Sequence, residues 1–544
     1  LAFRYRNPAM ILADGAMGTM LQSMGLAGGR SPEQWNIDRP DSVRAVHDAY
    51  IAAGAQLISS NTFGANALRQ RRSKRTAAEL ARAGMQIARD AANAAERACF
   101  AALDVGPLGT FLAPLGTTTF EEAVALFREP IEAAADLADC VLIETMGDVQ
   151  EAAAAVQAAK SAAPALPVFL TMSFDANGRL LSGASLEQAA AELIPLGIDV
   201  FGCNCGVGPA AMREHLSRLR AVTQVPIAIS PNAGLPRYEN GATVFSLDAP
   251  SFAAEMRDIL FGGARICGGC CGTTPDFIAA LAALPDANED VRPVRKRGVC
   301  SASHMTDFGG VRVIGERINP TGKKRFQQAL RERDFNYIME RAIEQQDAGA
   351  DILDINVGLP GIDEAEMMTA VVKAVQSVVS LPLQIDSSDP AAIEAGLRAC
   401  SGRAIVNSVN AEQDKLDTIL PIVKKYGAAV VGLTMDKSGI PQTAQARFDM
   451  AEKIMQEAMK HGIPKEDVLI DCLTLTISAQ QEQAVETLKA VRMVHEKLGL
   501  HCVLGVSNIS FGLPERNNIT TNFLTQAMWC GLDLPIINPN LKPI

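Results

Sequence analysis

Short runs of apolar, strand-forming residues recur along the first half of the chain, and stretches with helical periodicity separate them. The helical stretches are rich in Ala, Glu and Arg, as at 76–97 and 148–163. The apolar runs cover 11–15, 56–61, 100–106, 140–144, 168–172, 200–205, 227–230 and 264–269. Eight strand–helix units in about 280 residues are typical of a (β/α)8 barrel, and they predict one over residues 1–288.

The pattern is interrupted at residues 289–309, where Asp, Arg, Lys, Pro and Ser dominate and apolar periodicity fades. This composition predicts a linker between two domains. Apolar runs then resume at 311–317, 351–357, 383–386, 404–409, 428–435, 468–472, 502–507 and 535–538. They predict a second barrel over residues 310–544, so the expected fold class is α/β with two TIM-type barrels in tandem. The chain stops soon after the eighth run, which leaves open a C-terminal truncation of this barrel.

Composition narrows the classes of function. Of the 544 residues, 48% are hydrophobic and 20% are charged, so the chain can bury large cores and is not disordered as a whole. The formal net charge is −11, which argues against nucleic acid as the main partner. No apolar run is long enough to span a membrane and no secretory signal is visible, so we expect a cytoplasmic protein without a membrane partner.

Polar residues stand at or just after the carboxyl ends of many predicted strands. They are Asp14, Asn61, Glu144, Asn204 and Asn232 in the first half, and Glu316, Asn319, Asp354, Asn356, Asp386, Asn407, Asp471 and Asn508 in the second. In a (β/α)8 barrel this end carries the active site. A single residue of this kind is as often a helix cap or a turn residue. The two sets together favour two polar pockets.

Cysteines cluster near the end of the first half. Cys270 and Cys271 follow the eighth run in a glycine-rich turn, and Cys205 ends the sixth run. Adjacent cysteines cannot easily bridge each other, but both can bind one metal if the backbone turns sharply. Three thiolates suit zinc and leave a fourth, catalytic position open. Cys203 and Cys267 remain competing ligands, since strand alternation places Cys203 on the same side as Cys205, and buried free cysteines are the alternative to a metal site.

Several segments resemble known families. DGAMGT (14–19), NTFG (61–64), NC (204–205) and GGCCGTTP (268–275) resemble the homocysteine S-methyltransferase family. GERINPTG (315–322), DIN (354–356), QID (384–386), NS (407–408) and GVSN (505–508) resemble pterin-binding methyltransferase domains. The two in this order are similar to the N-terminal half of the cobalamin-dependent methionine synthase family. The resemblance implies methyl transfer from 5-methyltetrahydrofolate to cob(I)alamin, and from methylcobalamin to zinc-bound homocysteine.

For the first barrel, the resemblance implies Cys205, Cys270 and Cys271 as the zinc ligands and assigns Cys203 to packing. The substrate-binding residues that it implies are Asp14, Gly15, Glu144 and Asn204. The two carboxylates are suited to the ammonium group of homocysteine, and the backbone N–H groups after Gly15 to its carboxylate. Asn232 is a weaker hypothesis for the fourth zinc position in the absence of substrate.

For the second barrel, the resemblance implies a folate site. The residues that it implies are Glu316, Asn319, Asp354, Asn356, Asp386, Asn407, Asp471, Asn508 and Arg516. A carboxylate can accept two adjacent pterin N–H donors at once, and an Asn can complete the pattern. Asp386 and Asn508 are the expected catalytic residues, with Asn319 and Asn508 near the N5 atom that carries the methyl group. Arg516 is expected either at the folate tail or a pocket carbonyl, or in solvent.

The family's cobalamin-binding domain carries an Asp-x-His-x-x-Gly motif. None of the six histidines here has Asp two residues before it, so we expect cobalamin on another module or a separate corrinoid protein. One alternative is a zinc-dependent homocysteine methyltransferase with another donor, whose second barrel methylates a separate corrinoid protein. A non-catalytic metal- or folate-binding module is another.

Overall fold

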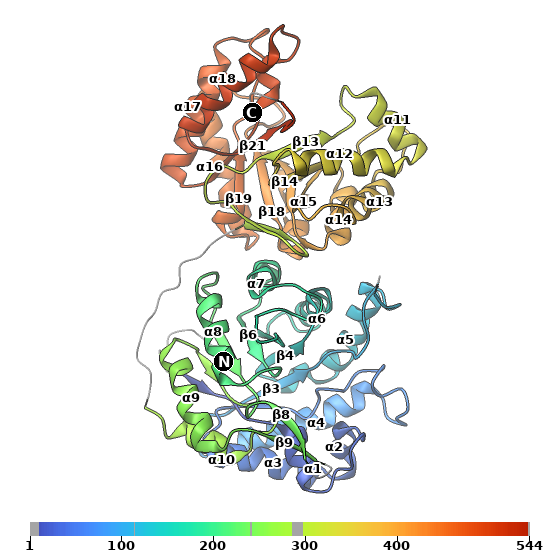
Figure 1. The fold of residues 1–544 in the computed structure, drawn as a ribbon, viewed down its shortest axis with the longest axis vertical. Coiled ribbons are helices and arrows are strands. Elements are labelled where there is room, and N and C mark those ends of the chain that lie inside the picture. Colours follow the sequence, from blue (N-terminus) through green and yellow to red (C-terminus); the bar gives the residue numbers. More distant parts are fainter. Residues whose placement is uncertain (1–9, 114, 240–241, 286–297, 542–544) are drawn as a thin grey trace. The chain divides into compact units, whose positions relative to one another are not determined.

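The computed structural model describes residues 10–113, 115–239, 242–285 and 298–541. It divides into two units, Leu1–Arg295 and Lys296–Ile544. In each unit, parallel strands form an inner ring and helices lie outside it (Figure 1). The α/β class and the two tandem TIM-type barrels predicted from the apolar runs are therefore confirmed. Among the described residues, no helix has both the length and the apolar character needed to cross a membrane.

All eight predicted runs of the first half form strands of one parallel sheet. They are β1 (Ile11–Leu12), β2 (Leu57–Ser59), β3 (Phe100–Val105), β4 (Cys140–Met146), β5 (Val168–Met172), β6 (Val200–Asn204), β7 (Ile227–Ser230) and β10 (Ile266–Cys267). Neighbours pair in the order β1-β10-β7-β6-β5-β4-β3-β2. A parallel bridge between Ala13 and Leu57 joins the two ends of this order and closes the ring. An antiparallel pair, β8 (Pro236–Glu239) and β9 (Ala242–Phe245), follows β7.

Helices connect these strands. They are α1 (Met17–Ser23), α2 (Trp35–Asp38), α3 (Pro40–Ala53), α4 (Ala77–Ala94), α5 (Phe120–Ala134), α6 (Val149–Ala162), α7 (Leu186–Leu193), α8 (Pro209–Arg220), α9 (Ala249–Phe261) and α10 (Pro275–Ala282). Local sequence explains where α4 and α5 begin. Thr76 with Glu79, and Thr119 with Glu122, form reciprocal side-chain-to-backbone capping boxes that satisfy the first free N–H groups.

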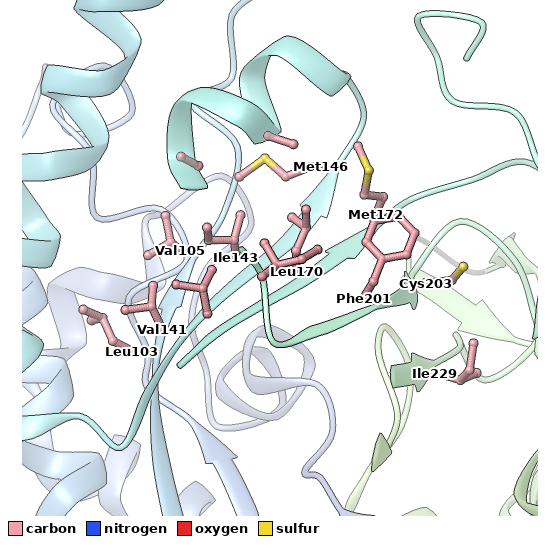
Figure 2. Close-up of a cluster of buried hydrophobic side chains, with 14 of the residues drawn as sticks. Leu103, Val105, Val141, Ile143, Met146, Leu170, Met172, Phe201, Cys203 and Ile229 are labelled. Atoms are coloured by element: carbon pink, nitrogen blue, oxygen red, sulfur yellow. The ribbon is translucent and has the colours of Figure 1, made fainter. Parts of the chain in front are cut away.

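Alternation along the strands of the first barrel separates two cores. Outward side chains pack together against the helices, and Figure 2 shows Leu103, Val105, Val141, Ile143, Phe201 and Cys203 among them. Inward side chains, such as Leu57, Phe169 and Ile266, form a second buried cluster inside the ring. This inner cluster fills the barrel, so a ligand can enter only at the mouth above it.

The second unit is a closed barrel of eight parallel strands, again at the eight predicted runs. They are β13 (Ile314–Ile318), β14 (Ile352–Asn356), β15 (Leu383–Asp386), β17 (Ile405–Asn410), β18 (Ala429–Leu433), β19 (Val468–Asp471), β20 (His501–Gly505) and β21 (Leu532–Ile537). The helices are α11 (Lys324–Glu332), α12 (Phe335–Asp347), α13 (Glu364–Gln376), α14 (Pro390–Ala399), α15 (Gln413–Tyr426), α16 (Ala444–Lys460), α17 (Gln483–Met493) and α18 (Arg516–Trp529). Inside the ring, Ile314, Ile352, Ile405, Val431, Leu469, Val503 and Leu534 form the buried layer below the mouth.

The segment predicted as a linker, 289–309, differs from that expectation in its second part. Residues 286–297 lie outside the described ones. The next residues form β11 (Gly298–Ser301) and β12 (Met305–Asp307), an antiparallel pair that β16 (Gly402–Arg403) extends. Val299 and Phe308 are buried in the inner cluster of the second barrel. In the sequence, charged residues and proline surround these two apolar residues, so the local composition does not indicate that they pack inside the barrel.

A buried arginine holds this hairpin in place. Arg403 donates to the carbonyl oxygens of Gly298 at 2.7 Å and Gly427 at 2.8 Å. Its Nη2 lies 2.9 Å from Oδ2 of Asp467, and both side chains are at most 2% exposed. The hairpin is therefore tied to the barrel by a charge pair that water does not screen.

Replacing Arg403 by Met should destabilise the second barrel strongly, because the Asp467 carboxylate would stay buried without its cation. Removing one partner of a buried pair costs about 3–5 kcal/mol. Urea unfolding followed by circular dichroism measures the loss. The control is Lys425→Met, which removes an exposed pair with Glu394 and should cost less than about 1 kcal/mol. Equal effects of the two substitutions would contradict the role of Arg403.

Candidate active sites at the two barrel mouths

Three cysteine sulfurs meet at the mouth of the first barrel. Cys205 follows the carboxyl end of β6, and Cys270 and Cys271 follow β10. The three Sγ atoms lie within 4.8 Å of one another, and those of Cys205 and Cys271 are 3.9 Å apart. The structure thus brings together the three residues that the sequence singles out as a metal site.

The backbone explains why Cys205 faces the mouth while Cys203 does not. Cys203 lies on β6 with its side chain in the buried outer cluster (Figure 2). Cys205 follows the strand with a positive φ of 58°, and Gly206 continues the turn at 71°. This left-handed turn breaks the two-residue alternation that would place both cysteines on one side. Cys267 is also buried in the outer cluster, away from the three sulfurs.

Backbone hydrogen bonds fix the turn that carries the other two cysteines. Gly269 N–H donates to the Asp14 carbonyl at 3.0 Å, and Cys270 N–H donates to the Pro231 carbonyl at 2.8 Å. A Cβ at Gly269 would lie 2.4 Å from Oγ1 of Thr273, so only glycine fits there. The Thr273 hydroxyl donates to the Cys270 carbonyl at 2.7 Å. The sulfurs are held by a rigid turn.

The chemistry of the three thiols fits a cation. Hydrogen bonds from Cys270 and Cys271 lower the pKa of Cys205 to about 3. The same contact with Cys205 raises the pKa of Cys270 well above its usual value. Protein groups alone therefore favour one thiolate and two thiols. A thiophilic divalent ion would be required to hold all three as thiolates, and the spacing of the sulfurs fits zinc.

A cavity of about 630 Å³ adjoins the three sulfurs at this mouth. Asp14, Gly15, Asp104, Glu144 and the three cysteines line it. The backbone from Gly15 to Thr19, at the start of α1, forms part of its wall. The cavity is large enough for a small amino acid beside the sulfurs.

The side chains of Asp14 and Glu144 are held by protein groups. The Asp14 carboxylate accepts from Ser59 N–H at 2.7 Å and from the Ser59 hydroxyl at 3.1 Å, and burial raises its pKa to about 7. Asn204 donates to Glu144 at 3.0 Å and to the Thr145 hydroxyl at 2.8 Å. Burial raises the pKa of Glu144 to about 8. Asn204 therefore orients Glu144.

Two other residues at strand ends form hydrogen bonds with backbone groups and neighbouring loops at the mouth. Asn61 donates its side-chain amide to the Pro32 carbonyl and to Asn36. Asn232 accepts from Cys271 N–H at 3.1 Å. The Asn232 side chain also forms a hydrogen bond with Cys205.

Sequence reasoning missed Asp104, which also lines the cavity. The residue stands inside the third predicted run, between Leu103 and Val105, whereas we sought polar residues at strand ends. A two-residue count along that run would have found it, since Leu103 and Val105 face outward and Asp104 inward.

In the second barrel, register places three predicted residues side by side. Asn356 of β14 pairs with Asp386 of β15, which pairs with Asn407 of β17. Asp354 faces inward on the same strand, two residues before Asn356. Its carboxylate accepts a hydrogen bond from Gln384 at 2.7 Å, and its side chain is also hydrogen-bonded to Asp386. Burial and the neighbouring Asp386 raise the pKa of Asp354 well above its usual value. Burial raises the pKa of Asp386 to about 6.

Asp471 ends β19, two strands beyond β17 in the ring order. Its carboxylate accepts from Leu473 N–H at 2.7 Å, and burial raises its pKa to about 6. Asn508 is exposed, in the turn 506–510 after β20. Arg516 donates to the Ser507 carbonyl at 3.1 Å and to the Ser510 hydroxyl at 3.3 Å, so it braces this turn.

Glu316 and Asn319 lie at and after the end of β13. The Asn319 side chain accepts from Thr321 N–H at 2.9 Å, within its own loop. Sequence reasoning also missed Lys323. Its ammonium group donates a hydrogen bond to the backbone carbonyl oxygen of Glu316 at 3.0 Å. Its charge interacts with the carboxylates of Glu316 and Asp354. From the sequence, Lys323 could have been found as a lysine in the loop that follows the first strand of the second barrel.

Comparisons with known proteins match one family to each barrel. The family model of homocysteine S-methyltransferase matches residues 11–284, and that of pterin-binding enzymes matches residues 315–538. Methionine synthases of Mycobacterium leprae and Mycobacterium tuberculosis are each 33% identical over 97% of this chain, and the chain spans 47% of each. A solved structure, the oxidized form of the homocysteine methyltransferase MmuM from Escherichia coli, is 25% identical over 52% of this chain and 98% of its own, with a TM-score of 0.45. The chain therefore belongs to the homocysteine S-methyltransferase family, with a pterin-binding enzyme domain after the methyltransferase domain.

Proposed function

We propose that the chain carries the two substrate sites of a cobalamin-dependent methionine synthase. The first barrel, over residues 1–288, would bind zinc and homocysteine, and the second, over 310–544, would bind 5-methyltetrahydrofolate. The observation that carries this proposal is the group of three cysteine sulfurs within 4.8 Å of one another beside a cavity. The zinc site and its reduced cysteines favour a reducing compartment, the cytoplasm.

In the first barrel, Cys205, Cys270 and Cys271 would hold the zinc ion. Zinc in such a site binds a substrate sulfur and keeps it as a thiolate near neutral pH. The carboxylates of Asp14 and Glu144 would face the substrate ammonium, and Asn204 keeps Glu144 in position. Backbone N–H groups after Gly15 would take the substrate carboxylate.

In the second barrel, the inward carboxylates would bind the pterin. Asp386 would accept two pterin N–H groups and Asn407 would contact the pterin beside it, while Asn356 and Asp354 form side-chain hydrogen bonds with Asp386. Asp471 would contact the pterin from across the ring. The remaining residues of this proposal are Glu316 and Asn319, Asn508 near N5, and Arg516. Because Arg516 contacts the 506–510 turn, its role would be to position Asn508.

The two sites belong to different barrels, and in the methionine synthase family that the chain resembles a cobalamin carries the methyl group between them. We assign this role to cobalamin on another module or a separate corrinoid protein. Asp386 and Asn508 would serve the transfer from folate to cob(I)alamin. The cysteine site would serve the transfer from methylcobalamin to homocysteine, giving methionine and tetrahydrofolate.

The first prediction concerns the metal. The purified chain should hold one zinc ion, and Cys270→Ala should remove it together with methyl transfer from methylcobalamin to homocysteine, because two sulfurs do not complete the site. Elemental analysis by mass spectrometry measures the zinc. Cys203→Ala and Cys267→Ala are matched controls, since both residues are buried in the outer cluster. Zinc lost from the controls but kept by Cys270→Ala would contradict the assignment.

The second prediction concerns Asp386. Its replacement by Ala should weaken methyltetrahydrofolate binding by about 2–4 kcal/mol, the cost of removing a charged hydrogen-bond partner. Since burial raises the pKa of Asp386 to about 6, the parent chain should also lose affinity as the pH falls below about 6 and the carboxylate takes up a proton. Calorimetric titration measures both.

The control for this prediction is Asp449→Ala, an exposed aspartate on α16. It should leave folate affinity and its pH dependence unchanged. Zinc content should stay at one ion per chain in both variants, because the metal site belongs to the other barrel. Unchanged folate affinity in Asp386→Ala would remove Asp386 from the site.

The third prediction tests the proposed function as a whole. Methyltetrahydrofolate and homocysteine should yield no methionine with this chain alone, and free cobalamin reduced to cobalt(I) should allow slow turnover. An untethered carrier lacks the effective concentration of a linked domain, so the rate should rise with cobalamin concentration. Each half-reaction should fail independently, the folate step in Asp386→Ala and the homocysteine step in Cys270→Ala. Efficient turnover without any corrinoid would sink the proposal.

A further inference from the structure

Four carboxyl groups belong to the cavity of the first barrel: Asp14, Glu33, Asp104 and Glu144. Three of them accept hydrogen bonds from other segments of the chain. Both oxygens of Asp14 accept from Ser59. Glu33 accepts from Gly64 N–H at 2.7 Å and also from the Ser31 hydroxyl. Glu144 accepts from Asn204 at 3.0 Å.

Asp104 differs from the other three, because its donor is the N–H group of Val105, the next residue on its own strand, and one of its oxygens stays free among the described residues. Its side chain is buried, with 6% of the residue exposed, and its Oδ1 has no hydrogen-bond partner in the part of the chain that the structure describes. Its neighbours Leu103 and Val105 point outward into the buried cluster of Figure 2, so the Asp104 carboxyl points into the ring. A buried oxygen without a donor is costly, and a ligand donor would remove that cost.

The strand order places this oxygen between the other acids. Asp104 lies on β3, which pairs with β2 on one side and with β4 on the other. Asp14 is fixed to Ser59 of β2, and Glu144 belongs to β4. The charges of Glu144, Asp14 and Glu33 all oppose ionisation of Asp104. A cation at this point would offset that repulsion and favour the ionised form of Asp104.

We propose that Asp104 is a specificity-determining residue of the first barrel, whose free Oδ1 accepts a hydrogen bond from the α-ammonium group of the amino-acid substrate. The inference rests on the proposed function of this barrel and deepens it. Asp104 would thus add a third carboxylate to Asp14 and Glu144. It would also make the cavity select a thiol that carries an ammonium group over one that carries only a carboxylate.

The experiment compares two thiols on the zinc-loaded full chain. One is L-homocysteine, and the other is 4-mercaptobutanoate, which keeps the thiol and the carboxylate but lacks the ammonium group. Calorimetric titration measures the affinity of each for the parent chain and for Asp104→Asn. The substitution keeps the size of the side chain and removes its ability to ionise when the ammonium group binds. Homocysteine affinity should fall roughly 10- to 100-fold, as for loss of a charged hydrogen-bond acceptor.

The analogue should bind Asp104→Asn as well as it binds the parent chain, or better. The analogue has no ammonium group, so it offers the Asp104 side chain no hydrogen-bond donor to accept from. Asp90→Asn, an exposed aspartate on α4, is the matched control and should change neither affinity. Zinc content and the melting temperature are measured on every variant, so that a general loss of structure is seen directly.

Two results would overturn the inference. One is unchanged homocysteine affinity in Asp104→Asn, and the other is an equal loss of affinity for both thiols. In either case the parent chain would still bind homocysteine, so the proposed function would stand. A zinc-loaded parent chain that binds neither thiol would instead overturn the proposed function of this barrel, and this inference with it.

Discussion

Closing eight parallel strands into a ring leaves each strand few inward positions, and both sites depend on how those positions are filled. Bulky side chains such as Phe169 occupy the inside of the first barrel, and Leu469 with its neighbours occupies the second. Polar side chains can then face inward only at the carboxyl ends. The same packing that stabilises each ring therefore confines its chemistry to one mouth.

Both barrel mouths contain buried acidic side chains, and burying these groups costs free energy. Asp14, Asp104 and Glu144 in one barrel, and Asp354 and Asp386 in the other, all have raised pKa values because water is excluded from them. A fold would not keep such groups for its own stability. Their presence on inward positions is the physical reason why we propose these ends of the barrels as binding sites.

Sequence periodicity predicted all sixteen barrel strands, because a ring strand is a short apolar run with a helix after it. It also singled out the cysteines whose sulfurs meet. It could not choose between Cys203 and Cys205, since that choice depends on a positive φ at Cys205. It missed Asp104 and Lys323, because their positions depend on which side of a strand or loop faces the mouth. It also interpreted 298–307 as linker, where long-range packing outweighs local composition.

The hairpin before the second barrel bears on where this chain can be divided. The match to pterin-binding enzymes begins at residue 315. A fragment cut there would lose Val299 and Phe308, which fill the floor of the barrel, and the Gly298 carbonyl that Arg403 binds. The exposed floor would be an apolar surface facing water, which favours aggregation. A separately expressed second barrel should therefore begin upstream of Gly298, well before the match to pterin-binding enzymes begins.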